Sequence, residues 1–285
     1  MMDLAPDTVA KPHGYDQIRA MRKSPLLPCL LLALASASGA QAGSSGWHHV
    51  EGGSIRIVTS GAPDEAGHLR GALEIRLKPG WKTYWLDPGA SGVPPTLEAS
   101  AGSREAGVEI GFPTPRRFDD GYALWAGYDE PLALALTLTL PEADAPTRLD
   151  ASVFLGVCET ICIPVQATLS FDPRSGTHDP DHAAVVDSAF AALPAPAGNG
   201  FSARVVEVRD DAMVVEATLP DGARALDLFV AGTETLALGT PEKADGAAGA
   251  QFRVPVETRV GKAREEMTYT LVTDRGAVTG TMRLP

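Results

Sequence analysis

The chain has 285 residues and a formal net charge of -12, from 24 Lys and Arg against 36 Asp and Glu. Its 44% hydrophobic and 21% charged residues are typical of a folded globular protein of one large or two ordinary domains. Nucleic acids and anionic lipid surfaces bind clustered Lys and Arg, so the acidic balance argues against both as partners. With 29 Gly and 23 Pro, the sequence favours many turns and short strands, and it excludes a coiled coil.

The first 42 residues have the pattern of a cleaved secretory signal peptide. An apolar run at 26–37 follows Arg22 and Lys23 and precedes an A-x-A cleavage site at 40–42. The run is too short to span a bilayer core, for which a helix needs about 20 residues. We therefore expect a periplasmic mature chain from Gly43 onward, with no membrane span; the alternative is an uncleaved anchor. Residues 1–20 fit poorly before such a signal, and we expect an over-extended start codon.

Strand patterns dominate the rest of the chain. Before residue 172, β-rich stretches between Gly and Pro breaks predict strands at 54–59, 71–77, 133–140, 151–155 and 168–171. Apolar residues at helical spacing then predict one helix at 181–193, with Asp181 as its N-cap. After a Pro- and Gly-rich stretch, strands are predicted at 203–208, 213–219, 225–230, 251–256, 267–273 and 277–284.

The regular spacing of these strands is typical of β-sandwiches. We therefore predict an all-β fold of two immunoglobulin-like β-sandwich domains joined by a short helical linker. The expected limits are 1–42 for the signal peptide, 43–172 for the first sandwich, 173–199 for the linker and 200–285 for the second sandwich.

Cys158 and Cys162 are the cysteines of the predicted mature chain, because Cys29 lies in the signal peptide. Their C-x-x-x-C spacing fits a metal site, a disulfide or two buried thiols. A structural zinc site needs four ligands, and no His lies within fifteen residues of the pair; copper(I), which accepts two thiolates, stays open. Since disulfides persist in an exported protein, we favour a disulfide and predict no metal site and no cofactor.

The short loop between the cysteines indicates what such a disulfide is for. In the chain-entropy treatment, a loop of five residues stabilises by roughly 2 kcal/mol, against about 4 kcal/mol for fifty. A structural bridge remains the alternative, but so small a gain favours a redox-active pair. Glu159 beside Cys158 disfavours the thiolate, so we expect exchange with a partner that supplies the attacking sulfur.

Four motifs follow one another along the first predicted sandwich. They are GWKTYWLDPGASG at 80–92, FPTP at 112–115, Gly127-Tyr128, and VCETICIP at 157–164. Together they resemble the periplasmic N-terminal domain family of the DsbD-type thiol:disulfide interchange proteins. The cysteine spacing is similar to the long form in ScsB-like copper-tolerance proteins, whereas the best-known members space their cysteines more widely. The resemblance extends weakly to the linker helix and the second β domain.

This resemblance implies an immunoglobulin-like sandwich whose redox pair, here Cys158 and Cys162, relays electrons. It implies a membrane thiol-electron transporter or a thioredoxin-like protein as electron donor and a periplasmic disulfide oxidoreductase as acceptor. Because the sequence lacks the family's membrane and thioredoxin-like parts, we expect a separate protein to supply the electrons. By the same resemblance, the partner attacks Cys162, and Cys158 leaves.

The family also shields its disulfide with a cap loop, and residues 117–128 occupy the matching stretch. Phe118, Tyr122 and Trp125 are therefore candidates for the shield; the alternative is that they are core aromatics. Tyr84 and Trp85 are expected in the sandwich core, each with its polar tip at the surface.

The sequence thus supports two functions of different classes. The first is a periplasmic thiol-disulfide oxidoreductase. The second is a non-catalytic immunoglobulin-like binding module for a partner protein or copper, with a structural disulfide. His48 and His49 could serve copper in that case, although such pairs are more often simply exposed. A hydrolase is not indicated, because neither G-x-S-x-G nor H-E-x-x-H occurs.

The signal-peptide prediction is tested by N-terminal sequencing of the exported protein. We expect the first residue to be Gly43, because the small residues at 40 and 42 form the cleavage site. An exported protein that retains residues 26–37 would contradict the prediction.

Overall fold

The computed structural model describes residues 43–89, 92–119, 121, 124–140, 148–175, 178–209, 211–244, 250–261 and 266–284. Gly39–Pro285 form one compact unit, to which all of these residues belong. The predicted signal peptide and Tyr122 lie outside the described residues. In the part of the chain that is described, no helix is long and apolar enough to cross a membrane.

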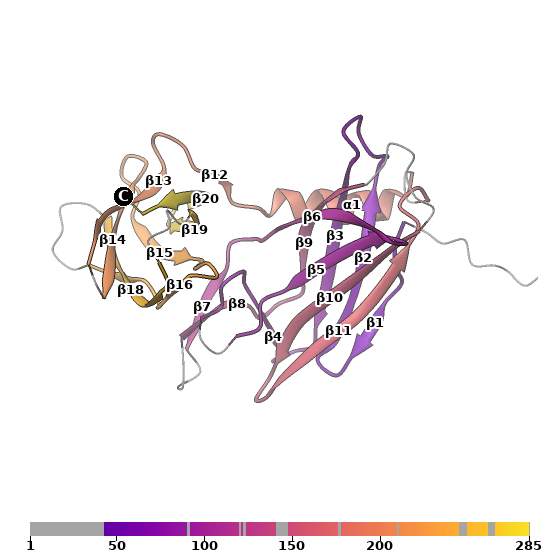
Figure 1. The fold of residues 1–285 in the computed structure, drawn as a ribbon, viewed down its shortest axis with the longest axis horizontal. Coiled ribbons are helices and arrows are strands. Elements are labelled where there is room, and N and C mark those ends of the chain that lie inside the picture. The colour runs from indigo at the N-terminus through magenta and orange to yellow at the C-terminus, as the bar shows by residue number, and fades with distance from the viewer. Residues whose placement is uncertain are drawn as a thin grey trace, which may run out of the picture. The chain divides into compact units, whose positions relative to one another are not determined.

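The first half of the chain is an 11-stranded antiparallel sheet that folds over on itself (Figure 1). Its strands are β1 (His48–Val50), β2 (Gly53–Ser60), β3 (His68–Leu77), β4 (Lys82–Tyr84), β5 (Thr96–Ala101), β6 (Arg104–Gly111), β7 (Arg116–Asp119), β8 (Leu124–Tyr128), β9 (Leu132–Thr139), β10 (Leu149–Cys158) and β11 (Cys162–Phe171). Their order is β1-β2-β3-β9-β6-β5-β10-β4-β8-β7, and β11 pairs with β10.

The sheet closes into a sandwich because β6 belongs to both layers. Its first residues pair with β5 and its later ones with β9. One core cluster therefore receives Ile55 and Leu73 from one layer and Val153 and Leu155 from the other. Each such side chain stabilises the fold by roughly 1.5–3 kcal/mol through the apolar area it removes from water.

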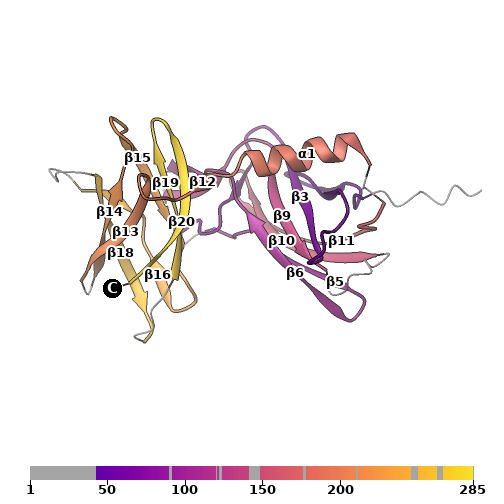
Figure 2. The ribbon, with the colours of Figure 1, turned by 90° about the horizontal axis from the view of Figure 1, so that it is seen from above.

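The single described helix, α1 (Pro180–Ala191), lies against the outer face of β2, β3 and β9 (Figure 2). Val186 and Ala189 of the helix pack with Val58, Ala72 and Ala135 of the three strands. The helix that the sequence places in a linker is therefore fastened to the first sandwich.

The predicted N-cap of this helix is wrong by two residues. Asp179 is the N-cap, and its carboxylate accepts hydrogen bonds from the backbone N–H groups of Asp181 and His182. Pro180 occupies the first helical turn, where its missing N–H costs no hydrogen bond, and this lets the helix begin before Asp181.

The second half of the chain is a smaller sandwich of two sheets, ordered β12-β20-β19-β15 and β13-β14-β18-β16, with β17 paired to β18. Its strands are β12 (Ala195–Pro196), β13 (Ser202–Val208), β14 (Ala212–Thr218), β15 (Ala225–Val230), β16 (Leu236–Leu238), β17 (Glu242–Lys243), β18 (Ala250–Arg259), β19 (Glu266–Thr273) and β20 (Gly276–Arg283). Leu228, Phe252 and Tyr269 are among the buried side chains between its sheets.

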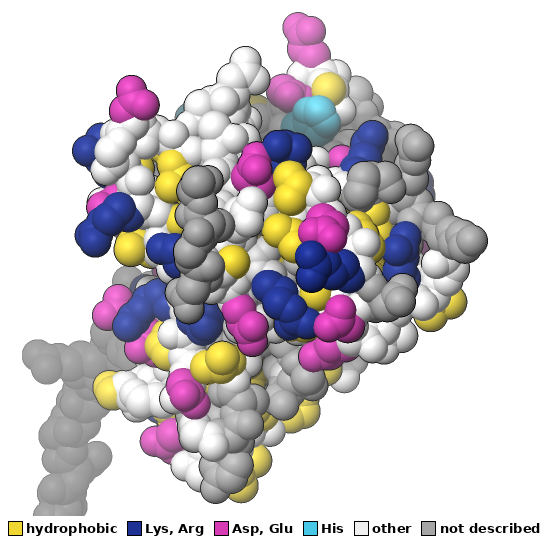
Figure 3. Space-filling model, turned by 90° about the vertical axis from the view of Figure 1, so that its left-hand side faces the viewer, with side chains coloured by type: hydrophobic (Ala, Val, Ile, Leu, Met, Phe, Trp, Pro, Cys, Tyr) yellow, Lys and Arg dark blue, Asp and Glu magenta, His cyan; other side chains and the backbone are white. Residues whose placement is uncertain are grey.

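Charged side chains of both signs share the surface. On the face shown in Figure 3, Lys and Arg lie among Asp and Glu rather than in one field. Arg204–Glu216 and Arg253–Asp211 are examples of ion pairs, at 2.6 and 2.7 Å. Exposed pairs of this kind contribute at most about 1 kcal/mol each. This face therefore offers no concentrated basic field of the kind that nucleic acids bind.

The predicted fold class is confirmed: the protein is all-β, and its described residues form two sandwiches with one helix between them in the sequence. Each of the eleven stretches predicted as strands lies on a strand of the structure. The prediction missed β5 and β6 and also seven strands of only two to five residues, namely β1, β4, β7, β8, β12, β16 and β17. Such short strands show too few alternations for a period to be recognised.

Candidate redox site

Cys158 and Cys162 face each other at the tip of a β-hairpin and form a disulfide bond. Cys158 is the last residue of β10 and Cys162 the first of β11, and the two are direct partners in the antiparallel register. Their Cα atoms are 4.1 Å apart. The hairpin thus positions both sulfurs, since the pairing continues down the two strands to Leu149 and Phe171.

The two cysteines differ sharply in exposure. Cys158 is only 3% exposed, whereas Cys162 is exposed to solvent. The cause is the strand order: β10 pairs with β11 on one side and, at Cys158, with Lys82 of β4 on the other. Ile161, between the two cysteines, is 76% exposed, so the hairpin tip reaches solvent. A partner in solution therefore reaches Cys162 more easily than Cys158.

The hydroxyl group of Tyr84 is within hydrogen-bond distance of both sulfurs. Its oxygen is 3.0 Å from Sγ of Cys158 and 2.9 Å from Sγ of Cys162. Disulfide sulfurs carry no hydrogen, so the hydroxyl is the donor and the sulfurs accept. Gly156 makes room for the tyrosine, because a Cβ at that position would lie 3.1 Å from a ring carbon of Tyr84.

An aromatic cluster covers the buried sulfur. The Trp125 ring meets Tyr84 edge-on at 5.6 Å, and Phe118 stacks on Trp125 at 4.2 Å between ring centroids. Tyr84, Trp125 and Cys158 form one buried cluster, against which Phe118 packs. We call Tyr84, Trp125 and Phe118 the aromatic cover.

One polar atom of the aromatic cover lacks a partner. The indole nitrogen Nε1 of Trp125 is buried, and it has no hydrogen-bond partner among the described residues. An unsatisfied buried donor costs about 1–3 kcal/mol, so the closed position of Trp125 depends on its other contacts. One of these is Lys82, whose Nζ lies 4.7 Å from the centre of the Trp125 ring.

Glu159 and the two candidate copper-binding histidines lie in solvent. Glu159 is exposed, so salt screens its charge and its effect on the thiolate is weaker than its place in the sequence suggests. His48 and His49 are exposed on β1. Among the residues that the structure describes, no group of three or more His, Cys, Asp or Glu side chains is placed to hold a metal ion.

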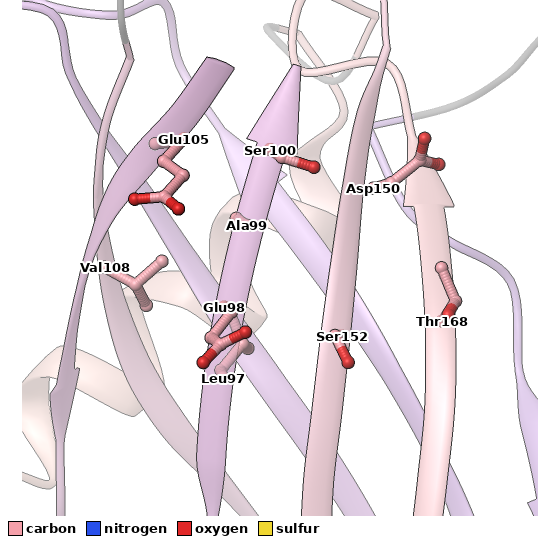
Figure 4. A pocket seen from close by; sticks show the side chains of 10 residues that line it. Leu97, Glu98, Ala99, Ser100, Glu105, Val108, Asp150, Ser152 and Thr168 are labelled. Atoms are coloured by element: carbon pink, nitrogen blue, oxygen red, sulfur yellow. The ribbon is translucent and has the colours of Figure 1, made fainter. Parts of the chain in front are cut away.

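An open hollow of about 520 Å³ lies elsewhere on the first sandwich, over β5, β6, β10 and β11 (Figure 4). Its lining includes the carboxylates of Glu98, Glu105 and Asp150. Ser170 and Arg148, which hydrogen-bond to Asp150, lower the pKa of its carboxyl group. Neither cysteine lines the hollow, so it is separate from the disulfide.

The structure brings together four of the five candidate site residues: the two cysteines, Phe118 and Trp125. Tyr84 and Trp85 are both buried, as expected, but neither belongs to the core cluster of the first sandwich. Tyr84 directs its hydroxyl onto the disulfide, and Trp85 is 2% exposed in a different cluster, with Phe229. Sequence reasoning missed Tyr84 because a buried aromatic residue in a short strand looks the same whether it faces a core or a disulfide.

The fold and the site together define an immunoglobulin-like β-sandwich protein with a disulfide at a solvent-exposed hairpin tip. Residues 58–173 match the family described as thiol:disulfide interchange protein DsbD, N-terminal. The chain therefore carries a DsbD-type N-terminal domain.

One solved structure shares the fold. The N-terminal periplasmic domain of ScsB from Proteus mirabilis aligns at a TM-score of 0.66 and 19% identity, over 85% of this chain and 98% of that chain. Tandem immunoglobulin domains of titin align over 80% of this chain and 93% of that chain at 9% identity, but with a TM-score of only 0.17 the two folds are not superposable. No curated protein matches the sequence significantly.

Removal of the cover should expose the disulfide to small thiols. We expect Trp125→Ala to speed reduction by dithiothreitol several-fold, because attack requires access along the S–S axis, and Phe118→Ala to have a smaller effect. Tyr122→Ala completes the series. Reduction is followed by quenching and alkylating the freed thiols.

Trp47→Ala is the matched control, since Trp47 stacks with Arg56 and Arg76 and not with the cover. Rates equal to the parent in Trp125→Ala, Phe118→Ala and Tyr122→Ala would assign these aromatics to the core.

Proposed function

We propose that the protein is a periplasmic thiol-disulfide oxidoreductase that relays electrons through Cys158 and Cys162. The observation that carries the proposal is the asymmetric disulfide, with Cys162 exposed and Cys158 buried beneath the aromatic cover. A bridge that served stability alone would gain little from a loop this short, roughly 2 kcal/mol in the chain-entropy treatment. The membership of residues 58–173 in the DsbD N-terminal family supports the same conclusion.

The first step is attack on the exposed sulfur. A thiolate of the reduced partner attacks Sγ of Cys162 and forms an intermolecular disulfide with it. The bond between Cys162 and Cys158 breaks, and Cys158 leaves as a thiolate with the electron pair of that bond. The order follows from exposure, because the aromatic cover lies on the side of Cys158.

The second step releases the partner. Its second thiolate attacks its own sulfur in the mixed disulfide, and Cys162 leaves as a thiolate. The partner's dithiol has then become a disulfide, and this chain's disulfide a dithiol. Two electrons have moved, and the two protons reach the cysteines through solvent. The reverse sequence passes the electrons to an oxidised acceptor.

Tyr84 stabilises the leaving sulfur. A thiolate at the buried position of Cys158 loses most of its hydration, which raises the free energy of the charged form. The Tyr84 hydroxyl, 3.0 Å from that sulfur, donates a hydrogen bond that strengthens as the negative charge develops. The same hydroxyl lies 2.9 Å from Cys162 and can serve either sulfur.

The partners we propose are a membrane thiol-electron transporter or a thioredoxin-like protein as donor and a periplasmic disulfide oxidoreductase as acceptor. The exposed Ile161 and Cys162 at the hairpin tip give such a partner a small apolar contact around the reacting sulfur. We propose the same domain limits as the sequence suggests, with the redox domain at 43–172 and the second sandwich at 200–285.

Single cysteine variants should trap the partner. In Cys158→Ser, the thiolate of the exposed Cys162 should attack the disulfide of an oxidised partner, whose second sulfur leaves as a thiolate, and the mixed disulfide should persist because this chain has no second cysteine to resolve it. The variants are incubated with periplasmic extract, and thiol-sensitive adducts are sought on a non-reducing gel. We expect adducts for Cys158→Ser and few for Cys162→Ser, whose remaining thiol is buried.

The competing function, a binding module with a structural bridge, makes the opposite prediction. If neither variant traps a partner and the double variant loses several kcal/mol of unfolding free energy, the bridge is structural and the relay fails.

The role of Tyr84 is tested by Tyr84→Phe. We expect reduction by a thioredoxin-like protein to slow roughly tenfold, because a hydrogen bond to a charged group contributes about 1.5–3 kcal/mol. Stopped-flow fluorescence with reduced thioredoxin measures the rate.

Tyr128→Phe is the matched control, since its hydroxyl donates to the carbonyl oxygen of Pro113 and not to a sulfur. Equal slowing in both variants would show that loss of any buried hydroxyl suffices, and Tyr84 would have no specific role.

A further inference from the structure

Three neighbouring strands, β4, β8 and β7, form a layer with two different faces. Successive side chains of a strand point to opposite faces. Phe118 and Trp125 point toward Tyr84 and the disulfide, whereas their neighbours Arg117 and Ala126 contact residues of the second sandwich. One thin layer therefore separates the disulfide from the second sandwich.

The back of this layer is packed against β15 and the residue that follows it. Trp85, which follows β4 directly, meets the ring of Phe229 at 5.7 Å. Ala126, Tyr128 and Ala231 complete the buried cluster around these two rings. Asp87 adds a polar contact, because its carboxylate accepts a 2.7 Å hydrogen bond from the backbone N–H of Gly232.

Arg117 is the strongest polar contact between β7 and the second sandwich. Its Nε and Nη2 each donate a 2.9 Å hydrogen bond to the carboxylate of Asp227, and Nη2 also donates to the carbonyl oxygen of Leu228. Its guanidinium group lies 4.6 Å from the centre of the Phe229 ring. The side chains of Arg117 and Asp227 are only 19% and 26% exposed, so solvent screens this two-pronged pair little.

The first sandwich by itself holds the β7–β8 hairpin weakly. β7 is the last strand in the order of the sheet and pairs with β8. β8 in turn pairs with β4 through Thr83↔Tyr128 and Tyr84↔Gly127. The unpartnered indole N–H of Trp125 adds a cost to the closed position. The contacts of the opposite face of the layer with the second sandwich offset this cost.

We propose that the second sandwich holds the aromatic cover over Cys158, and that Arg117 is the positioning residue that transmits this hold. We call the two hydrogen bonds from the Arg117 guanidinium group to the Asp227 carboxylate the fork. Because Phe118 is the next residue after Arg117, the fork fixes the backbone that carries the Phe118 ring. Loss of the fork frees the hairpin, lifts Phe118 and Trp125, and exposes the sulfur that the cover protects. The proposal deepens the relay function by assigning the second sandwich a part in the choice of the attacked sulfur.

The test measures how fast the buried thiol is alkylated. In the Cys162→Ser background of the mature chain, Cys158 is the single thiol, and its reaction with iodoacetamide reports the cover directly. We expect Arg117→Ala to raise this rate roughly tenfold, and Arg117→Lys, which keeps the charge but not the fork, to raise it less. Rates are compared as pH-independent values from a pH series, so that a change in the thiol pKa is not mistaken for exposure.

Two backgrounds separate positioning from general loosening. In Cys158→Ser, the already exposed Cys162 should react at the same rate with and without Arg117→Ala. In Cys162→Ser with Trp125→Ala, the cover is already open, and adding Arg117→Ala should give no further increase. Arg204→Ala, which breaks the Arg204–Glu216 ion pair within the second sandwich, is the matched control and should change no rate.

An unchanged Cys158 rate in Arg117→Ala overturns the proposal, as does an equal rise at both cysteines. The alkylation assay involves no partner protein. If it succeeds while the cysteine variants trap nothing, the cover is held as proposed and the relay function fails; the reverse result leaves the relay and removes the role of Arg117.

Discussion

The site depends on the alternation of side chains across three short strands. In β4, β8 and β7, one face carries Tyr84, Trp125 and Phe118 and the other contacts the second sandwich. A strand cannot turn one of these residues without turning its neighbours, because the side-chain period is two. The environment of the disulfide is therefore linked mechanically to the surface behind it. This constraint is the basis of our proposal that the second sandwich, which contributes no atom to the disulfide, holds the aromatic cover.

The disulfide itself depends on a second constraint, the register of β10 and β11. The two strands pair from Leu149↔Phe171 to Cys158↔Cys162, so backbone hydrogen bonds hold the cysteines opposite each other whether or not the sulfurs are bonded. We therefore expect reduction to separate the two sulfurs without releasing the strands. A carrier needs this property, because each cycle would otherwise include the free-energy cost of reordering the hairpin.

The position of each cysteine in the sheet divides their roles. Cys158 lies between β11 and β4 and is buried, whereas Cys162 begins a strand whose described pairing is with β10. Burial makes a thiolate at Cys158 costly, and Tyr84 offsets part of that cost. In the relay that we propose, exchange is therefore directional: the exposed sulfur meets the partner, and the buried sulfur leaves and later closes the bond again.

The sequence by itself determined the all-β class, the eleven recognised strands and the cysteine pair, because these depend on local alternation, on Gly and Pro breaks and on a distinctive motif. Its motifs also pointed to the DsbD N-terminal family and to Phe118 and Trp125. It misplaced the N-cap at Asp181, since Pro180 allows an earlier start, and it placed Tyr84 and Trp85 together in a core. Only the tertiary structure decided that these two neighbours point to opposite faces of the layer, so that Tyr84 contacts the disulfide and Trp85 contacts Phe229. The physical reason is distance along the chain: Tyr84 meets Cys158, and Arg117 meets Asp227, through contacts between residues 74 and 110 positions apart, which no local pattern encodes.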